Sequence, residues 1–258
     1  MLLALDIGNT AITIGVFDGE KIHSRWSIAT DVENLVDEYA ILLLNLLQTE
    51  NLRAADIDEA VLGSVVPSLT PVFQDVCRRY FKVAPLVVDP GVRTGIRILY
   101  DSPRDVGADR VIDAVAAIKL YGPPLIIVDF GTATVFDAIS REGDYVGGAI
   151  APGIGISLEA LFKRTAKLPR IELERPKTAI GKTTVSAMQS GVIFGYVGLI
   201  EGIIARMKKE LDGDTKVIAT GGYAPLIARE TPVIQEVNVD LTLVGLRLIQ
   251  EANRGQGH

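Results

Sequence analysis

Two short stretches of this sequence combine an aspartate with a glycine and small polar residues, a pattern suited to binding phosphate together with a cation. Residues 6–10 read DIGNT after an apolar run, and residues 129–132 read DFGT after another. A glycine turn between two strands presents backbone N–H groups to an anion, and hydroxyl and amide side chains add further hydrogen bonds. The aspartate that ends the first apolar run, Asp6, is placed to hold a hydrated cation beside such phosphates.

Either stretch alone is equally consistent with an ordinary β-hairpin turn. The repetition favours the binding interpretation, because the two stretches lie in the same order about half a chain apart. The similarity continues further on, where residues 61–67 (VLGSVVP) and 217–223 (VIATGGY) each run from a short strand into small residues. Two related halves indicate an internal duplication, with a nucleotide bound between them.

The segments between these loops predict helices. One is expected over residues 32–52, capped by Thr30 or Asp31. A longer one is expected from Thr184 to about Leu211, with glycines recurring along one face. A smooth face of this kind favours close packing against another helix, in a domain or a dimer interface.

A further helix is expected from Gly107 to about Tyr121, and the Gly-Pro-Pro that follows it marks the boundary between domains of residues 1–121 and 122–258. Asp105, Asp109 and Asp113 are spaced to share one face of this helix. For Asp105 the favoured interpretation is a solvated capping residue. Asp109 differs because it lies one turn inside the helix, after two small residues that let a ligand approach the backbone, which makes it a candidate for chemistry.

Composition limits the class of protein. The net charge of −6 over 258 residues argues against a nucleic-acid partner, because phosphate contacts need a basic face. The only cysteine, Cys77, excludes an internal disulfide and a cysteine metal cluster. Although 48% of the residues are hydrophobic, no uncharged apolar run approaches the roughly 20 residues of a membrane span. We therefore expect a cytoplasmic protein whose partners include neither a membrane nor a nucleic acid.

Together these motifs resemble one family over essentially the whole chain, the type III pantothenate kinases. The motifs that carry the resemblance are residues 6–10 (DIGNT), 64–67 (SVVP), 107–110 (GADR), 129–134 (DFGTAT), 147–148 (GG), 152–153 (PG) and 181–184 (GKTT). The two phosphate loops are shared with the wider superfamily of actin, sugar kinases and heat-shock chaperones, whereas GADR is the specific motif. The resemblance implies an α/β fold of duplicated ribonuclease H-like (actin-like ATPase) domains with an interdomain nucleotide cleft.

The resemblance also implies the reaction, ATP-dependent phosphorylation of the primary hydroxyl of pantothenate to 4'-phosphopantothenate, the first step of coenzyme A biosynthesis. Asp109 matches the general base of the family, and Asp129 matches its monovalent cation site for K⁺ or NH₄⁺. The residues implied to bind ATP and its Mg²⁺, with Asp6 at the metal, are Asp6, Ile7, Gly8, Asn9, Thr10, Ala11, Ile12, Thr13 and Thr132. Those implied to contact pantothenate are Tyr100, Gly107, Ala108, Asp109, Arg110 and Thr184.

The family forms homodimers with the active site at the subunit interface, which suits the glycine-lined helix from Thr184. Two other functions remain open at this point. Another actin-superfamily small-molecule kinase or phosphatase would keep both loops but has no particular need for GADR. A non-enzymatic nucleotide-binding regulatory protein would use the cleft as a switch, although an intact base candidate at Asp109 argues against it.

Overall fold

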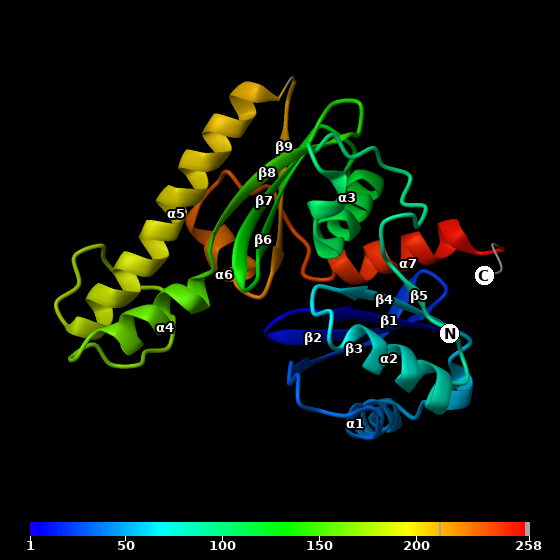
Figure 1. The fold of residues 1–258 in the computed structure, drawn as a ribbon. Coiled ribbons are helices and arrows are strands. Elements are labelled where there is room, and N and C mark those ends of the chain that lie inside the picture. Colours follow the sequence, from blue (N-terminus) through cyan, green and yellow to red (C-terminus); the bar gives the residue numbers. More distant parts are fainter. Residues whose placement is uncertain (212, 256–258) are drawn as a thin grey trace. The chain divides into compact units, whose positions relative to one another are not determined.

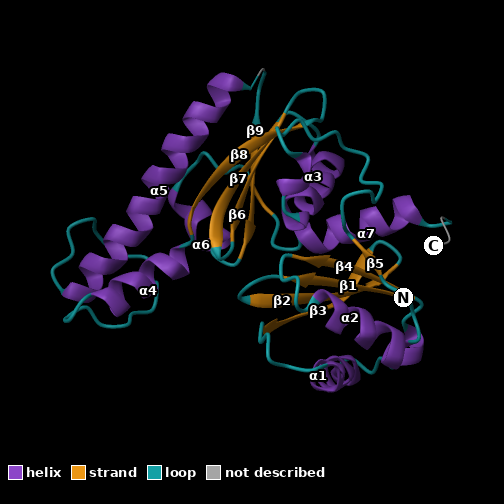
Figure 2. Cartoon of the chain, viewed as in Figure 1, coloured by secondary structure: helices purple, strands orange, loops and turns teal. Residues whose placement is uncertain are grey.

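The computed structural model describes residues 1–211 and 213–255, which form two compact units (Figures 1 and 2). The first unit contains residues 1–95 and 102–116 together with the chain from residue 241 onward, and the second contains residues 96–101 and 117–240. This division departs from the predicted boundary between residues 121 and 122 in three places, one of which is that residues 117–121 belong to the second unit. The C-terminal helix packs with the first unit, and a short segment around Tyr100 packs with the second.

The first unit is built on a five-stranded mixed sheet with the strand order β3-β2-β1-β4-β5. The central strand β1 is antiparallel to β2 and parallel to β4. The strands are β1 (Leu2–Ile7), β2 (Ala11–Asp18), β3 (Lys21–Ala29), β4 (Glu59–Ser64) and β5 (Leu86–Val87). The helices are α1 (Val36–Thr49), α2 (Thr70–Val76), the first part of α3 (Ala108–Tyr121) and α7 (Leu241–Asn253). A π-helical turn (Cys77–Phe81) continues α2, and short 3-10 turns lie at Ala54–Asp56 and Pro103–Asp105.

The second unit repeats this plan with the strand order β10-β9-β6-β7-β8. Here the central strand β6 is antiparallel to β7 and parallel to β9. The strands are β6 (Leu125–Phe130), β7 (Ala133–Ile139), β8 (Tyr145–Pro152), β9 (Lys216–Gly221) and β10 (Glu236–Val237). The helices are α4 (Ile154–Arg164), α5 (Thr184–Glu210) and α6 (Ala224–Ile227), followed by a 3-10 turn at Ala228–Glu230.

The two halves correspond strand by strand, which confirms the predicted duplication. In both β1 and β6 the first four residues are buried and the aspartate that follows is half-buried. Asp6 pairs with Thr13 across the first hairpin, and Asp129 pairs with Val135 across the second. The repeated sequence motif therefore reflects a repeated sheet topology and not two unrelated turns.

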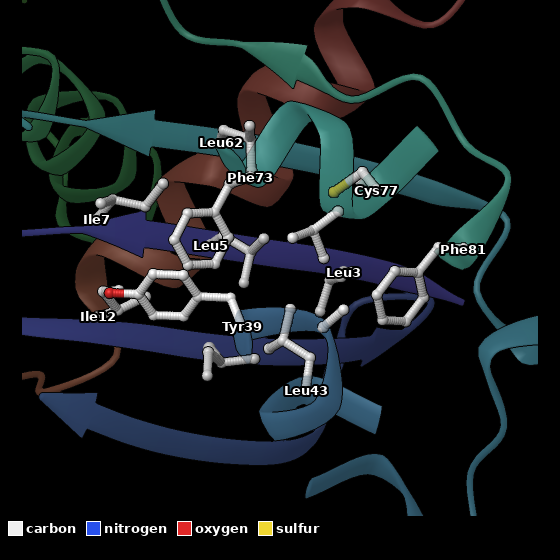
Figure 3. Packing of buried hydrophobic residues seen from close by; sticks show 14 of the residues in the cluster. Leu3, Leu5, Ile7, Ile12, Tyr39, Leu43, Leu62, Phe73, Cys77 and Phe81 are labelled. Carbon is white, nitrogen blue, oxygen red and sulfur yellow. The ribbon is translucent and has the colours of Figure 1, made fainter. Parts of the chain in front are cut away.

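Apolar residues cover both faces of β1, which explains why its sequence is a continuous apolar run. Leu3, Leu5 and Ile7 lie against α1 and α2, where the rings of Tyr39 and Phe73 pack with their centroids 4.6 Å apart (Figure 3). The alternate residues of β1, Leu2 and Ala4, belong to a second cluster with the apolar face of α7. The sheet of the first unit is thus buried between helices.

Helix α1 begins four residues later than predicted, at Val36. The expected capping side chains have other partners: the Thr30 hydroxyl donates to the carbonyl of Gly8 (2.6 Å), and the Asp31 carboxylate accepts from the N–H of Glu33 (3.0 Å). The helix start is capped instead by Glu38, whose carboxylate accepts from the N–H of Leu35 (2.7 Å).

Helix α5 agrees closely with its predicted range and forms the main helical support of the second unit. By length and composition alone, this one helix in the described part of the chain could cross a membrane. One side of the helix is interior, since Ile193 and Ile200 are fully buried and Ile200 packs in the core of the second unit. Its Glu201 accepts a hydrogen bond from the Thr231 hydroxyl (2.7 Å).

Candidate active site

The first phosphate loop is the three-residue turn between β1 and β2. The N–H of Gly8 donates to the carbonyl of Ala11 (3.1 Å) and so closes the turn, which means that this N–H does not face an anion as expected. The side chains of Asn9 and Thr10 at the tip are exposed, and Asp6 is half-buried near the end of β1. The turn therefore offers a ligand short polar side chains at its tip and a carboxylate at its base.

The remaining predicted residues of this loop differ in how far their side chains are buried. Ile7 and Ile12 are fully buried, so their side chains belong to the core and only their backbone is suited to contact a ligand. Ala11 and Thr13 are half-buried. A supporting residue that sequence reasoning missed is Thr30 at the end of β3, whose N–H also donates to the carbonyl of Thr10 (3.1 Å). From the sequence alone, Thr30 is instead expected to cap the following helix.

The second phosphate loop, between β6 and β7, is held more tightly than the first. The N–H of Gly131 donates to the carbonyl of Ala133 (3.1 Å), and Thr132 is exposed at the tip. A β-carbon built at Gly153 would lie 2.1 Å from the carbonyl oxygen of Thr132, so the chain leaving β8 lies directly against this loop. Only glycine permits so close a backbone approach.

The carboxylate of Asp129 lies close against two glycines, in space that a side chain at either position would need. A β-carbon at Gly221, which has a φ of +87°, would lie 2.5 Å from Asp129 Oδ1, and one at Gly131 would lie 3.2 Å from Oδ2. Within the described residues, no group of three or more His, Cys, Asp or Glu side chains could hold a metal ion. A cation at Asp6 or Asp129 would therefore take its other oxygen ligands from backbone carbonyls, water or substrate phosphates, which suits Mg²⁺ bound with a nucleotide.

The base candidate Asp109 is the second residue of α3, so it lies in the first turn of the helix and not one turn inside it as predicted. Its Oδ1 accepts from the N–H of Arg110 (2.8 Å), and a β-carbon at Gly107 would approach the same oxygen to 2.6 Å. Burial raises the pKa of the Asp109 carboxyl, against the opposing effect of the Arg110 N–H and guanidinium. A raised pKa strengthens a carboxylate as a proton acceptor, provided that it is ionised at the working pH.

The predicted common face of three aspartates is only partly observed. Asp105 lies before α3, exposed in a separate 3-10 turn, so it does not belong to the helix. Asp109 and Asp113 do share a face, and Asp113 is buried with an exposed fraction of 3%. Of these carboxylates, Asp109 is the one that lies within the helix and is only half-buried.

Tyr100 is held against the edge strand β8 of the second unit. Its ring packs edge-on against Tyr145, with centroids 6.4 Å apart, and a β-carbon at Gly147 would lie 3.8 Å from it. The backbone N–H of Leu99 donates to the carbonyl of Tyr145 (2.8 Å). The Tyr145 hydroxyl in turn donates to the buried carboxylate of Asp137 (2.6 Å), so the surface under Tyr100 is anchored by a buried hydrogen bond that the sequence did not reveal.

Thr184 is the first residue of α5 and is exposed. The preceding Thr183 caps the helix, since its hydroxyl accepts from the N–H of Ser186 (3.1 Å). Gly181 packs against the first turn, where a β-carbon would lie 2.3 Å from the backbone nitrogen of Ala187. The GKTT motif is thus a helix start that presents Thr184.

The comparisons with known proteins decide the family. The sequence matches the type III pantothenate kinase family over residues 2–206. A type III pantothenate kinase of Geobacter sp. (strain M21) is 49% identical over 254 residues, which cover 98% of this chain and 100% of the relative. That of Geobacillus kaustophilus (strain HTA426) is 52% identical over 253 residues and 98% of both chains. The chain belongs to the type III pantothenate kinase family.

As a member of the type III pantothenate kinase family, the chain is an enzyme, a kinase that phosphorylates pantothenate in coenzyme A biosynthesis. This membership decides against the two alternative functions. The identity of about one residue in two over nearly the full chain also means that the relatives share its whole architecture and not one half of it.

Solved structures at low sequence identity show the fold. The activator of the 2-hydroxyisocaproyl-CoA dehydratase from Clostridium difficile aligns over 100% of this chain and 98% of its own, with a TM-score of 0.57 and 14% identity. The ethanolamine utilization protein EutJ from Carboxydothermus hydrogenoformans aligns over 96% and 89%, with a TM-score of 0.54 and 18% identity. The predicted fold class, duplicated actin-like domains, is confirmed.

Proposed function

We propose that Asp109 is the general base of this kinase and accepts the proton of the pantothenate primary hydroxyl as that oxygen attacks the γ-phosphate of ATP. The observation that carries the proposal is the setting of its carboxylate, in the first turn of α3 and partly buried with a raised pKa. Phosphoryl transfer depends mainly on positioning and charge neutralisation, so one well-placed base is the main acid–base group that the reaction needs.

ATP is bound, in this proposal, by residues 6–13 together with Thr132. The exposed tips at Asn9, Thr10 and Thr132 offer hydrogen bonds to phosphate oxygens. The half-buried carboxylate of Asp6 would hold the Mg²⁺ that accompanies ATP. The metal ion supplies positive charge that neutralises the phosphates.

Asp129 is proposed to hold a monovalent cation, K⁺ or NH₄⁺. Support comes from its position against Gly131 and Gly221, where only the absence of side chains lets the backbone come so close to the carboxylate. Because Asp6 and Asp129 are equally half-buried, the proposal of a different ion at Asp129 rests on the residues around its carboxylate.

Pantothenate is proposed to contact Tyr100, residues 107–110 and Thr184. Tyr100 offers an aromatic ring packed against Tyr145 of β8, and the small residues Gly107 and Ala108 give access to the start of α3. Thr184 offers a hydroxyl at the exposed start of α5.

The active enzyme is proposed to be a cytoplasmic homodimer with its active site at the subunit interface. Support comes from α5, where Gly191, Gly195 and Gly198 are exposed and a β-carbon at any of them would meet no atom within 4 Å. Two isoleucines of the same unit are also exposed, Ile150 by 65% and Ile180 by 80%. A helix of a second copy laid on the glycine face would cover surface that is otherwise in water.

The proposal is tested by incubating the purified chain with pantothenate and Mg·ATP and following 4'-phosphopantothenate by mass spectrometry, with and without K⁺. We expect ATP-dependent product that requires the monovalent cation. Product formed equally in sodium-only buffer would contradict the Asp129 assignment, and no product under any condition would contradict the proposed activity.

A further inference from the structure

Two side chains on the turn of α3 that follows Asp109 are buried against other elements of the first unit. Ile112 has an exposed fraction of 0% and Asp113 of 3%. They lie three and four residues after Asp109, so they occupy the same side of the helix one turn further on. Whatever fixes these two residues also fixes where the first turn of α3, and hence Asp109, lies.

Ile112 fits into a space left by two glycines from different elements. A β-carbon at Gly245 of α7 would lie 2.2 Å from the Ile112 carbonyl oxygen and 2.7 Å from its Cγ2. A β-carbon at Gly63 of β4 would lie 2.5 Å from Ile112 Cδ1. The backbones of α3 and α7 are therefore in direct contact at Gly245, and the depth of α3 above the sheet is set by these two glycines.

The neighbouring residue, Asp113, fixes the rotation of the helix. The hydroxyl of Thr242, at the start of α7, donates to Asp113 Oδ1 at 2.7 Å. A hydrogen bond from a hydroxyl to a buried carboxylate is strong and directional, since the carboxylate has lost hydration on burial. Thr242 and Gly245 thus hold α3 at two consecutive residues, one by hydrogen bonding and one by close packing.

We propose that Thr242 and Gly245 of the C-terminal helix are positioning residues for catalysis, which hold α3 so that Asp109 meets the substrate hydroxyl. The inference rests on the proposed function, in which Asp109 is the base. It assigns a catalytic task to α7, a helix that lies beyond residues 2–206, the part of the chain that the family pattern matches. Neither residue touches the substrate in this proposal.

The alternative is that these contacts only stabilise the first unit. A double-mutant cycle distinguishes the two explanations. If a residue acts only through Asp109, the effect of replacing that residue disappears once Asp109 has been replaced. A contact that only stabilises the fold lowers activity by the same factor whether or not the base is present. A contact that works through Asp109 has nothing left to position once Asp109 is replaced.

The test uses Thr242→Val, which keeps the shape but removes the hydroxyl, with Thr242→Ser as the conservative control. Because a misplaced catalytic group of this kind costs up to about 100-fold, we expect Thr242→Val to lower kcat by about 10- to 100-fold. We expect Thr242→Ser to keep most of the wild-type kcat. Calorimetric titration with Mg·ATP should give unchanged stoichiometry and affinity, which excludes a loss of folded enzyme.

The cycle is completed in the Asp109→Asn background, where we expect Thr242→Val to change the residual rate by less than about twofold. Three results would overturn the inference while leaving the proposed base intact. They are an equal loss of kcat on Thr242→Val in both backgrounds, an ATP-binding stoichiometry that falls in step with kcat, and full turnover in Thr242→Val. Full turnover in Asp109→Asn would overturn the proposed base and the inference with it. Gly245→Ala should be at least as damaging as Thr242→Val, but the conclusion does not depend on it because that variant can fail to fold.

Discussion

Replacing Gly153 by alanine should impair the second phosphate loop without straining the backbone at the site of change. Gly153 has φ −72° and ψ 158°, a conformation that alanine adopts freely. The cost therefore arises entirely from the new methyl group, which would lie 2.1 Å from the Thr132 carbonyl oxygen and 2.8 Å from that of Gly131. The two atoms that must give way belong to the loop itself.

The size of the effect follows from this overlap. Restoring a normal van der Waals separation requires the loop or its neighbour to move by about 1 Å. Overpacking of this degree typically costs about 1–3 kcal/mol of unfolding free energy. A displacement of about 1 Å in a group that positions substrate can cost about 100-fold in rate. We therefore expect Gly153→Ala to raise the KM for ATP and to lower kcat/KM for ATP by about 100-fold.

The assay is steady-state kinetics with ATP as the varied substrate, accompanied by thermal unfolding to confirm that the variant is folded. Gly155→Ala is the matched control, two residues away in the first turn of α4, because its β-carbon would make only an ordinary 3.4 Å contact with the Tyr223 hydroxyl. The control should behave like wild type. A Gly153→Ala enzyme with wild-type kcat and KM for ATP would show that the position of the second loop does not matter for ATP.

Three further predictions concern the base, the cation and the assembly. Asp109→Asn should lower kcat by about 10²–10⁴-fold and raise the free energy of unfolding at pH 7, as measured by product formation and urea unfolding. Asp129→Ala should abolish the stimulation of kcat by K⁺ over Na⁺, measured across a titration of each salt. Gly195→Leu or Gly198→Leu should give a folded monomer without kinase activity and with ATP binding partly retained, measured by size-exclusion chromatography with light scattering beside the kinase assay. In the isolated chain a β-carbon at either glycine meets nothing within 4 Å, so we attribute the expected loss to packing against a second subunit.

The stability gain in Asp109→Asn follows from the direction of the pKa shift. Burial raises the folded-state pKa of Asp109 above its unfolded value, so ionisation is disfavoured in the folded protein. The favourable contribution of this group is complete below the unfolded pKa and is lost as the pH rises through the folded one. At pH 7 the ionised carboxylate therefore destabilises the folded protein, and replacement by asparagine removes this destabilisation. In the wild type, kcat should fall on the acid side with an apparent pKa above the usual carboxyl range.

Specific results would contradict each of these predictions. Wild-type turnover in Asp109→Asn would remove that residue from the mechanism. A K⁺ response that survives Asp129→Ala would place the cation elsewhere. A wild-type protein that is monomeric and fully active at assay concentration would refute the shared active site.

The fold could be predicted from sequence where the signal is local. The Asp-x-Gly pattern after an apolar run marks a strand and its turn within a few residues, and its repetition at residues 6–10 and 129–132 revealed the duplication. The start of α3 and the range of α5 were also predicted correctly, because glycine and proline mark helix ends within the sequence itself.

The failures arise where a residue's partner is distant in sequence. Thr30 has the composition of a helix cap, but its hydroxyl bonds to Gly8, a residue 22 positions earlier. The packing of Gly153 on Thr132 and the bond from Thr242 to Asp113 likewise join separate elements. Local propensity carries no information about such contacts, so the residues that support the candidate site were missed while those within the motifs were found.

The duplication also bears on how one scaffold would serve the two ions proposed above. Both hairpins place a half-buried aspartate at the same position of the central strand, so the difference between them must come from the surroundings. The loop after Asp6 is longer and exposes Asn9 and Thr10 at its tip, which suits the large, hydrated phosphates of Mg·ATP. Around Asp129 the loop is shorter, and glycines at 153 and 221 pack backbone against it from two sides. A tightly packed carboxylate suits a singly charged ion, because desolvation penalises a divalent ion more steeply than a monovalent one. The placement of glycines, more than the aspartates themselves, thus supports the proposed division of Mg·ATP to the first loop and K⁺ to the second.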